Sequence, residues 1–168
     1  GGAKQLRPRD PGSRDGDVLI QDGLITSVTA KVSSTPPGTV VLDAAGCVVA
    51  PGLVDLHTHL REPGREEAET VETGARAAAL GGYTAVVAMP NTEPAIDCAA
   101  AVRQVQDLGA DTCCGVYPAG AITVGRDGRQ LAPLAEMAAL GVRIFTDDGS
   151  GVQDARLMRR ALEYASAL

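Results

Sequence analysis

The chain has 168 residues, enough for one ordinary domain or for a piece of a larger one. It is 45 % hydrophobic but contains only one Phe, three Tyr and no Trp, so its core must be built from Ala, Val, Leu and Ile. The 15 basic and 21 acidic residues give a net charge of −6. With no basic cluster, this balance argues against a nucleic-acid partner or an anionic membrane surface.

Neither a membrane nor a secretory location is expected. The sequence shows no signal peptide, and its longest apolar stretch, residues 77–90, is interrupted by Gly81-Gly82 and is too short to span a bilayer. The four cysteines, Cys47, Cys98, Cys113 and Cys114, form no C-x-x-C pattern. A reduced cytoplasmic protein is therefore predicted.

Residues 1–50 are predicted to form a small β element that is not a complete domain. The first sixteen residues are rich in Gly, Pro, Arg and Asp and are expected to be irregular. Residues 17–28 carry two apolar runs around Asp22-Gly23, a pair that favours a type I′ hairpin turn. Residues 40–42 and 47–50 are predicted to add two short strands.

From residue 51 the pattern changes to alternating strands and helices. Strands are predicted at 53–56, where the strand is expected to be buried, and at 83–89, 112–118 and 142–145. Helices are predicted at 70–80, at 97–108 with Asp97 as the cap, at 133–140, and from about residue 154. Four consecutive βα units imply a parallel sheet, either an open doubly wound sheet or part of a barrel.

The position of the polar residues favours the barrel. No Gly-x-Gly-x-x-Gly turn follows the first strand, as it would in an open dinucleotide-binding sheet. Polar clusters instead follow the predicted strands, and a barrel gathers its active site at those strand ends. Residues 51–168 are therefore expected to be the first four βα units of a (β/α)8 barrel, half of a fold that needs about 250 residues.

The strongest candidate site is the pair His57 and His59, the only histidines in the chain. Side chains alternate along a strand, so residues two apart leave the same face. Two imidazoles in this relation can bind one metal ion. The alternative interpretation is a chance His-x-His in a solvated loop.

Asp148 is the candidate third metal ligand, because the fourth predicted strand brings it to the same rim and a carboxylate can bridge two ions. Asp-Asp-Gly is also ordinary turn chemistry, and Asp147 is the competing residue. Arg61 is expected to bind a substrate carboxylate, unless it is a surface arginine paired with Glu62. Asn91 offers a donor and an acceptor to an amide-like substrate, unless it only forms a turn.

Four motifs in this order resemble dihydroorotases of the long bacterial type, metal-dependent barrels of the amidohydrolase superfamily. They are Val49–Gly64 (VAPGLVDLHTHLREPG), Gly81–Thr84 (GGYT), Met89–Thr92 (MPNT) and Phe145–Gly149 (FTDDG). The resemblance implies that His57 and His59 bind zinc, that Asp148 bridges a pair of zinc ions, and that His59, Arg61 and Asn91 contact the substrate. It also implies that residues 1–50 belong to a small β-sandwich flanking the barrel.

The implied reaction is the reversible hydrolysis of dihydroorotate to N-carbamoyl-aspartate in pyrimidine biosynthesis. The family's later histidines and its proton-shuttling aspartate would lie beyond Leu168, so no catalytic residue is assigned in this chain, and residues 1–168 alone are expected to be an inactive fragment. The alternatives are a related hydantoinase or allantoinase, or a non-catalytic scaffold for aspartate transcarbamoylase. A homo-oligomer in which half-barrels complete each other is also expected.

Overall fold

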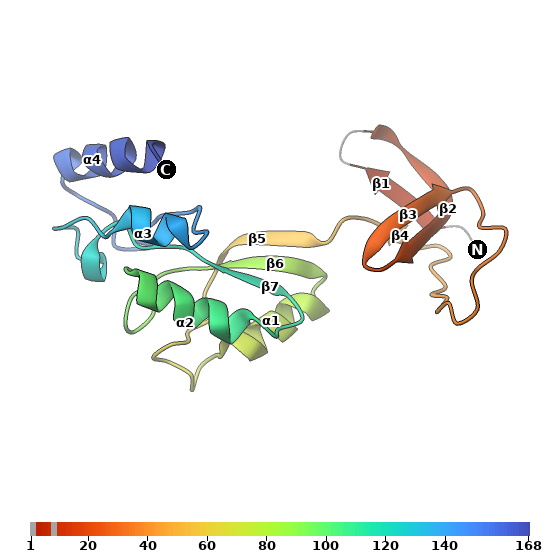
Figure 1. The fold of residues 1–168 in the computed structure, drawn as a ribbon, viewed down its shortest axis with the longest axis horizontal. Helices are drawn as coiled ribbons and strands as arrows, with labels where there is room; N and C mark the ends of the chain where they lie inside the picture. Colours follow the sequence, from red (N-terminus) through yellow and green to blue (C-terminus); the bar gives the residue numbers. More distant parts are fainter. Residues whose placement is uncertain (1–2, 8–9) are drawn as a thin grey trace. The chain divides into compact units, whose positions relative to one another are not determined.

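The computed structural model describes residues 3–7 and 10–168. These residues form two compact units that divide between Pro51 and Gly52. The first unit is a four-stranded sheet of order β3-β2-β1-β4 (Figure 1). Its strands are β1 (Ala3–Arg7), β2 (Asp10–Gln21), β3 (Leu24–Thr29) and β4 (Val48–Val49). Strands β1 and β3 pair antiparallel with β2, whereas β4 pairs parallel with β1.

The predicted hairpin of the first unit is confirmed. Asp22 and Gly23 have φ values of 50° and 74°, and Gln21 lies opposite Leu24 across the turn. Positive φ at both central residues is the requirement of a type I′ turn.

Two other predictions for this unit were wrong. Residues 3–7 and 10–16 are strands and not irregular, because β1 and β2 pair with each other, which their composition does not indicate. Residues 1–2 and 8–9 lie outside the described part. Val40, Val41 and Leu42 form no strand and are 82 %, 75 % and 85 % exposed. An apolar run becomes a strand only where another strand hydrogen-bonds to it, and in the described chain none does.

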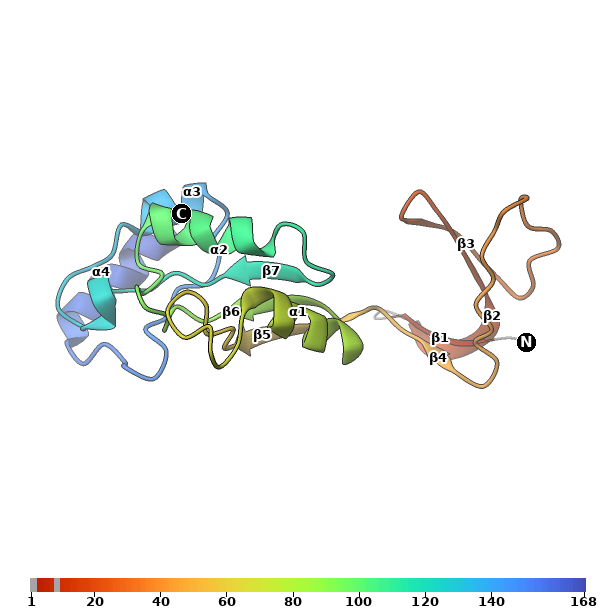
Figure 2. The same cartoon turned by 90° about the horizontal axis from the view of Figure 1, so that it is seen from below.

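The second unit is built on a parallel three-stranded sheet of order β5-β6-β7. Its strands are β5 (Leu53–Thr58), β6 (Tyr83–Ala88) and β7 (Gly115–Pro118), and helices α1 (Val71–Leu80) and α2 (Ala99–Gly109) lie on one face of this sheet (Figures 1 and 2). Further elements are the 3-10 turn η1 (Val124–Arg126), α3 (Leu134–Ala139) and α4 (Ala155–Ser166). This alternation of parallel strands and helices is the predicted βα pattern.

Alternation along the strands decides which side chains enter the core. Val86 and Ala88 of β6 join the buried cluster with Val71 of α1 and with Val102 and Val105 of α2. The intervening side chains line a hollow that also takes residues from β5, β7 and the segment after α3: Val54, Leu56, Ala85, Val87, Tyr117 and Ile144. The buried contacts that stabilise the sheet therefore lie on the face that α1 and α2 cover.

The predicted burial of the first strand was wrong. Leu53, Val54 and Leu56 are all more than half exposed. In the described chain β5 is an edge strand of its sheet, paired only with β6, so an apolar sequence alone could not bury it.

The fourth predicted strand, residues 142–145, is reduced to one parallel bridge between Gly120 and Phe145. Gly120 donates to the carbonyl of Ile144 (3.0 Å) and accepts from the N–H of Thr146 (2.9 Å). These two hydrogen bonds attach residues 142–145 to Gly120, just after the end of β7. The turn that follows residue 145 therefore lies at the rim of the sheet. Among the described residues, no helix has the length and apolar character needed to cross a membrane.

Side chains cap the first turns of two helices, whereas a predicted cap of a third helix makes a tertiary contact instead. Thr70 caps α1 by accepting from Thr73 N–H, and Asp154 caps α4 by accepting from Arg156 and Leu157. Asp97 was wrongly predicted as the cap of α2: that helix begins after Cys98, and Asp97 accepts instead from Gly125 N–H (2.7 Å).

Candidate metal centre

The candidate centre lies at the carboxyl ends of the parallel strands. His57 belongs to β5 and His59 follows it, Asn91 follows β6, and Asp148 follows the bridged segment 142–145. Loops at this end of a parallel sheet converge because all the strands run in the same direction. Residues far apart in the sequence therefore meet at one rim.

His57, His59 and Asp148 each offer one ligand atom, and these atoms lie within 4.8 Å of one another. His57 Nε2 is 3.1 Å from Asp148 Oδ1, and His59 Nδ1 is 4.0 Å from Asp148 Oδ2. The two imidazole rings meet edge to face with centroids 5.1 Å apart. Two imidazoles and one carboxylate form a donor set that suits zinc and related divalent ions, so the residues present fit a metal.

The strand geometry accounts for the orientation of the histidines. Thr58, between them, donates its hydroxyl to the carbonyl of Val87 (2.8 Å), and its own carbonyl accepts from Met89 N–H (2.9 Å). These bonds fasten the end of β5 to β6. The residues on either side of Thr58 consequently share the face that meets Asp148.

The two neighbouring aspartates have different environments. The carboxylate of Asp147, only 2 % exposed, accepts from the N–H groups of Ile122 (2.8 Å) and Thr123 (3.0 Å) and from the Thr123 hydroxyl. Asp148 has a φ of 26°, and its side chain faces the histidines. The structure therefore brings Asp148, and not Asp147, into the donor group.

Asn91 lies beside this group, with its Oδ1 2.9 Å from Nδ1 of His59. A hydrogen bond from a ring N–H to an acceptor on a second residue fixes the orientation of an imidazole, as in many metal centres. The sequence had indicated only a substrate contact or a turn former at this position, and it carried no signal for a contact between Asn91 and His59.

Arg61 is not part of the donor group. It is half-buried, has a φ of 63°, and its carbonyl accepts from Arg65 N–H (3.0 Å). Glu62, its possible ion-pair partner, instead accepts from Val71 N–H (2.7 Å) at the start of α1. In the same loop Gly64 N–H donates to Glu66 (2.7 Å), which lowers the pKa of the Glu66 carboxyl.

Arg126 is a residue that sequence reasoning missed. Its guanidinium donates to the carbonyls of Asp147 (3.0 Å) and Asp148 (2.5 Å). An arginine in a Gly-rich loop is ordinary in sequence terms, so no pattern could have indicated this contact.

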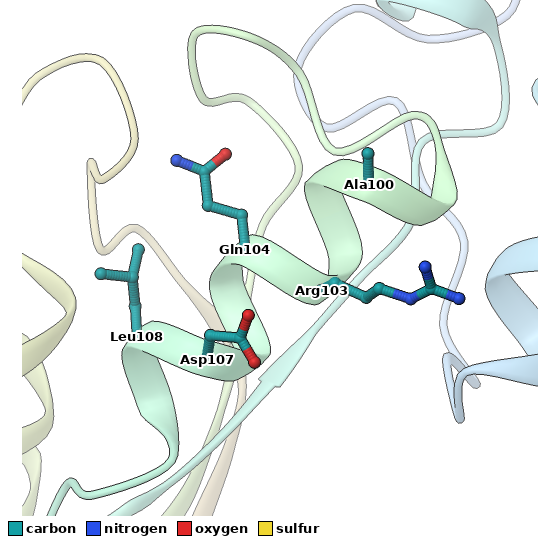
Figure 3. A pocket seen from close by; sticks show the side chains of 5 residues that line it. All are labelled: Ala100, Arg103, Gln104, Asp107 and Leu108. Carbon is teal, nitrogen blue, oxygen red and sulfur yellow. The ribbon is translucent and has the colours of Figure 1, made fainter.

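In the described part of the chain, surface hollows also lie outside the donor group, and two of them can be defined by their residues. One is the apolar hollow on the open face of the sheet described above. The other is formed by α2 alone, and Figure 3 shows its five side chains, Ala100, Arg103, Gln104, Asp107 and Leu108, spread along the exposed face of that helix. Neither hollow includes His57, His59 or Asp148.

Comparison with known proteins shows the family of this chain. The family model described as dihydro-orotase-like matches residues 46–168. The chain belongs to the dihydro-orotase-like family. It is 53 % identical over 169 residues to the dihydroorotase of Streptomyces coelicolor, covering 99 % of this chain and 38 % of the relative. It is 49 % identical over 166 residues to the dihydroorotase of Mycobacterium tuberculosis, covering 97 % and 38 %.

These comparisons confirm the predicted resemblance, and the chain spans about 38 % of the length of both dihydroorotases. Among solved structures, L-hydantoinase from Arthrobacter aurescens superposes with a TM-score of 0.72 at 22 % identity, covering 86 % of this chain and 31 % of the other. A D-hydantoinase superposes with a TM-score of 0.66 at 20 % identity, covering 99 % and 36 %. These likenesses confirm the predicted fold class, part of an α/β barrel.

Proposed function

We propose that this chain supplies part of the zinc centre of a cyclic amide hydrolase that interconverts dihydroorotate and N-carbamoyl-aspartate. The observation that carries the proposal is the meeting of His57, His59 and Asp148 at one rim of the sheet in a member of the dihydro-orotase-like family. Relatives named dihydroorotase at about half identity support the choice of substrate.

His57, His59 and Asp148 would hold the metal. A divalent ion, when bound, supplies a Lewis acid and activates water near neutral pH. The carboxylate of Asp148 lies near both imidazoles, with Oδ1 towards His57 and Oδ2 towards His59, so it would hold the same ion as the two histidines. A second zinc ion bound by this carboxylate is proposed from the family resemblance. Low exposure of the Asp148 side chain, 9 %, keeps this carboxylate from being fully hydrated.

Arg61 and Asn91 are proposed to select a substrate that bears a carboxylate, together with His59. A guanidinium presents a planar fork that matches a carboxylate, and the amide of Asn91 can donate through Nδ2 while its Oδ1 contacts His59. In this proposal Asn91 both orients a metal-binding imidazole and reaches the substrate.

Metal binding tests the first part of the proposal. Zinc affinity of the full chain, measured by competition with a chelator, should fall in His57→Ala, His59→Ala and Asp148→Asn by more than the roughly 10–100-fold that loss of a supporting residue costs. Asp107→Asn is the matched control, because Asp107 is an exposed aspartate on α2, away from the donor group. Equal zinc affinity in all four variants and the wild type would overturn the assignment.

Substrate competition tests the second part. In any active enzyme that contains this chain, Arg61→Met and Asn91→Ala should raise KM for dihydroorotate, because the carboxylate loses its partners. Preferential opening of hydantoin or allantoin rings would move the function to those related enzymes. Tight binding to aspartate transcarbamoylase with neither turnover nor zinc affinity would indicate a scaffold.

We further propose a cytoplasmic homo-oligomer, with aspartate transcarbamoylase as the first partner to test. The exposed edge of β5, with its apolar Leu53, Val54 and Leu56, supports association through strand pairing. Light scattering of the purified protein measures the oligomeric state, and a monomer at all concentrations would contradict this proposal. Cell fractionation tests the location.

A further inference from the structure

We propose that Arg126 is a positioning residue that holds Asp148 in the orientation needed to bind metal. The inference rests on the proposed function above. Arg126 extends from η1 and touches the turn that carries Asp148 at three points: Nε donates to the carbonyl of Asp147 (3.0 Å), and Nη2 donates to the carbonyl of Asp148 (2.5 Å) and to the hydroxyl of Ser150 (3.2 Å).

The backbone of Asp148 needs such support. Its φ of 26° lies in a region that residues other than glycine rarely adopt. Such a conformation persists only where the surrounding structure enforces it, and it is common at functional sites. Here the N–H of Asp148 donates to the Thr146 hydroxyl (3.0 Å), and its carbonyl is held by Arg126. With both main-chain groups engaged, only the side-chain torsions of Asp148 remain free.

The preceding residue adds a second anchor between the same two segments. Asp147 binds Ile122 and Thr123, which lie a few residues before Arg126. The side chain of Asp147 therefore reaches from the turn into the loop, while the side chain of Arg126 reaches from the loop into the turn. Side chains from both segments thus hydrogen-bond to the other segment, and together they hold the turn that carries Asp148 against the loop.

The loop that carries Arg126 is itself tied to the other side of the donor group. Gly125 N–H donates to Asp97 (2.7 Å), and Ala121 N–H donates to the carbonyl of Ile96 (2.7 Å). Asp97 and Ile96 belong to the segment after β6 in which Asn91 contacts His59. The loop thus connects the segment that orients His59 to the turn that orients Asp148.

A guanidinium suits this role better than an ammonium group. Its donors lie in one rigid plane, so Nε and Nη2 can bind two successive carbonyls at the same time. Lysine would offer a single flexible point charge and could retain only part of this grip. The Arg126→Lys variant therefore separates geometry from charge.

Zinc affinity and the absorption spectrum of bound Co²⁺ in the full chain test the inference. Arg126→Met should weaken zinc binding by about 10–100-fold, the usual effect of losing a supporting residue, and should change the Co²⁺ ligand-field bands, with Arg126→Lys intermediate. Arg143→Met is the matched control, because Arg143 also donates to two carbonyls, of Ala138 and Val142, away from the donor group. It should leave both readouts as in the wild type.

Several outcomes would overturn the inference. Wild-type zinc affinity and Co²⁺ bands in Arg126→Met would do so, and so would a loss of affinity matched by Arg143→Met, since both arginines would then act only through general stability. If Arg126→Met does not fold, a wild-type spectrum and affinity in Arg126→Lys would count against the role. Zinc binding that is insensitive to Asp148→Asn would instead show failure of the proposed metal centre itself.

Discussion

His57 Nε2 lies 3.1 Å from Oδ1 of Asp148, although one residue belongs to β5 and the other to the turn after residues 142–145. The contact exists because β5, β6 and β7 run parallel and because Gly120 forms a parallel bridge with Phe145, just before the turn that carries Asp148. The candidate centre therefore depends on the packing of the whole second unit.

The paired aspartates should separate stability from metal binding. In Asp147→Asn, one buried acceptor loses its charge and faces the Thr123 hydroxyl with a mismatched group, so the free energy of unfolding should fall by about 1–3 kcal/mol. Asp148→Asn should change it less, by no more than about 1 kcal/mol, because its partner His57 is 59 % exposed and the isosteric amide can still contact the imidazoles. Urea denaturation measures both, and a larger loss in Asp148→Asn would contradict the roles described for these residues.

A glycine substitution should show that the loop between β5 and α1 (the first loop) packs against the loop between β6 and α2. Gly64 has a φ of 103°, and an added Cβ would overlap the carbonyl oxygen of Glu93. Gly64→Ala should therefore destabilise the protein by the roughly 1–2 kcal/mol of a positive φ and by about 1–3 kcal/mol more for the overlap.

Gly128→Ala provides the comparison, because Gly128 has a φ of 73° with nothing near its added Cβ. It should cost only the conformational term, which thermal denaturation of both variants can measure. Equal losses in the two variants would show that the first loop yields without resistance.

The cysteines should differ in reactivity. Cys47 and Cys113 are exposed, whereas Cys114 is buried in the core between the sheet and the helices. Burial raises the pKa of the Cys114 thiol, and the neighbouring Cys113 raises it further, so less of it is present as the reactive thiolate. Alkylation followed by peptide mass spectrometry should label Cys114 after Cys47 and Cys113. Labelling in denaturant, where all four should react alike, is the control.

The first loop should contribute to the pH dependence of stability through Glu66. The N–H of Gly64 lowers the pKa of the Glu66 carboxyl from its ordinary value of 4.5. A carboxyl whose folded-state pKa is lowered stabilises the protein above its unfolded pKa, and this contribution disappears as the pH falls through the folded value.

Comparison with Glu66→Gln measures this effect. The melting temperature of the wild type should exceed that of Glu66→Gln near neutral pH, and the difference should shrink as the pH is lowered below 4.5. A difference that grows on acidification would contradict the sign of the pKa shift.

Sequence alone determined the features that depend on neighbouring residues. Asp22-Gly23 predicted the hairpin because these residue types accept positive φ, and the turn they form sets Gln21 opposite Leu24. The alternation of strands and helices after residue 51 followed from hydrophobic periodicity, which is local. The spacing of His57 and His59 placed both on one face of a strand for the same reason.

Tertiary structure decided everything that needs a distant partner. Composition could not show that residues 3–7 pair with β2, nor that residues 142–145 form a single bridge to Gly120 in place of a strand, because strand pairing depends on which segment lies alongside. Asp147 and Asp148 are adjacent and chemically identical, but Ile122 and Thr123 donate to the carboxylate of Asp147, and the carboxylate of Asp148 faces the histidines. Sequence supplied the groups that can bind a metal, and long-range hydrogen bonds decided which of them face one another.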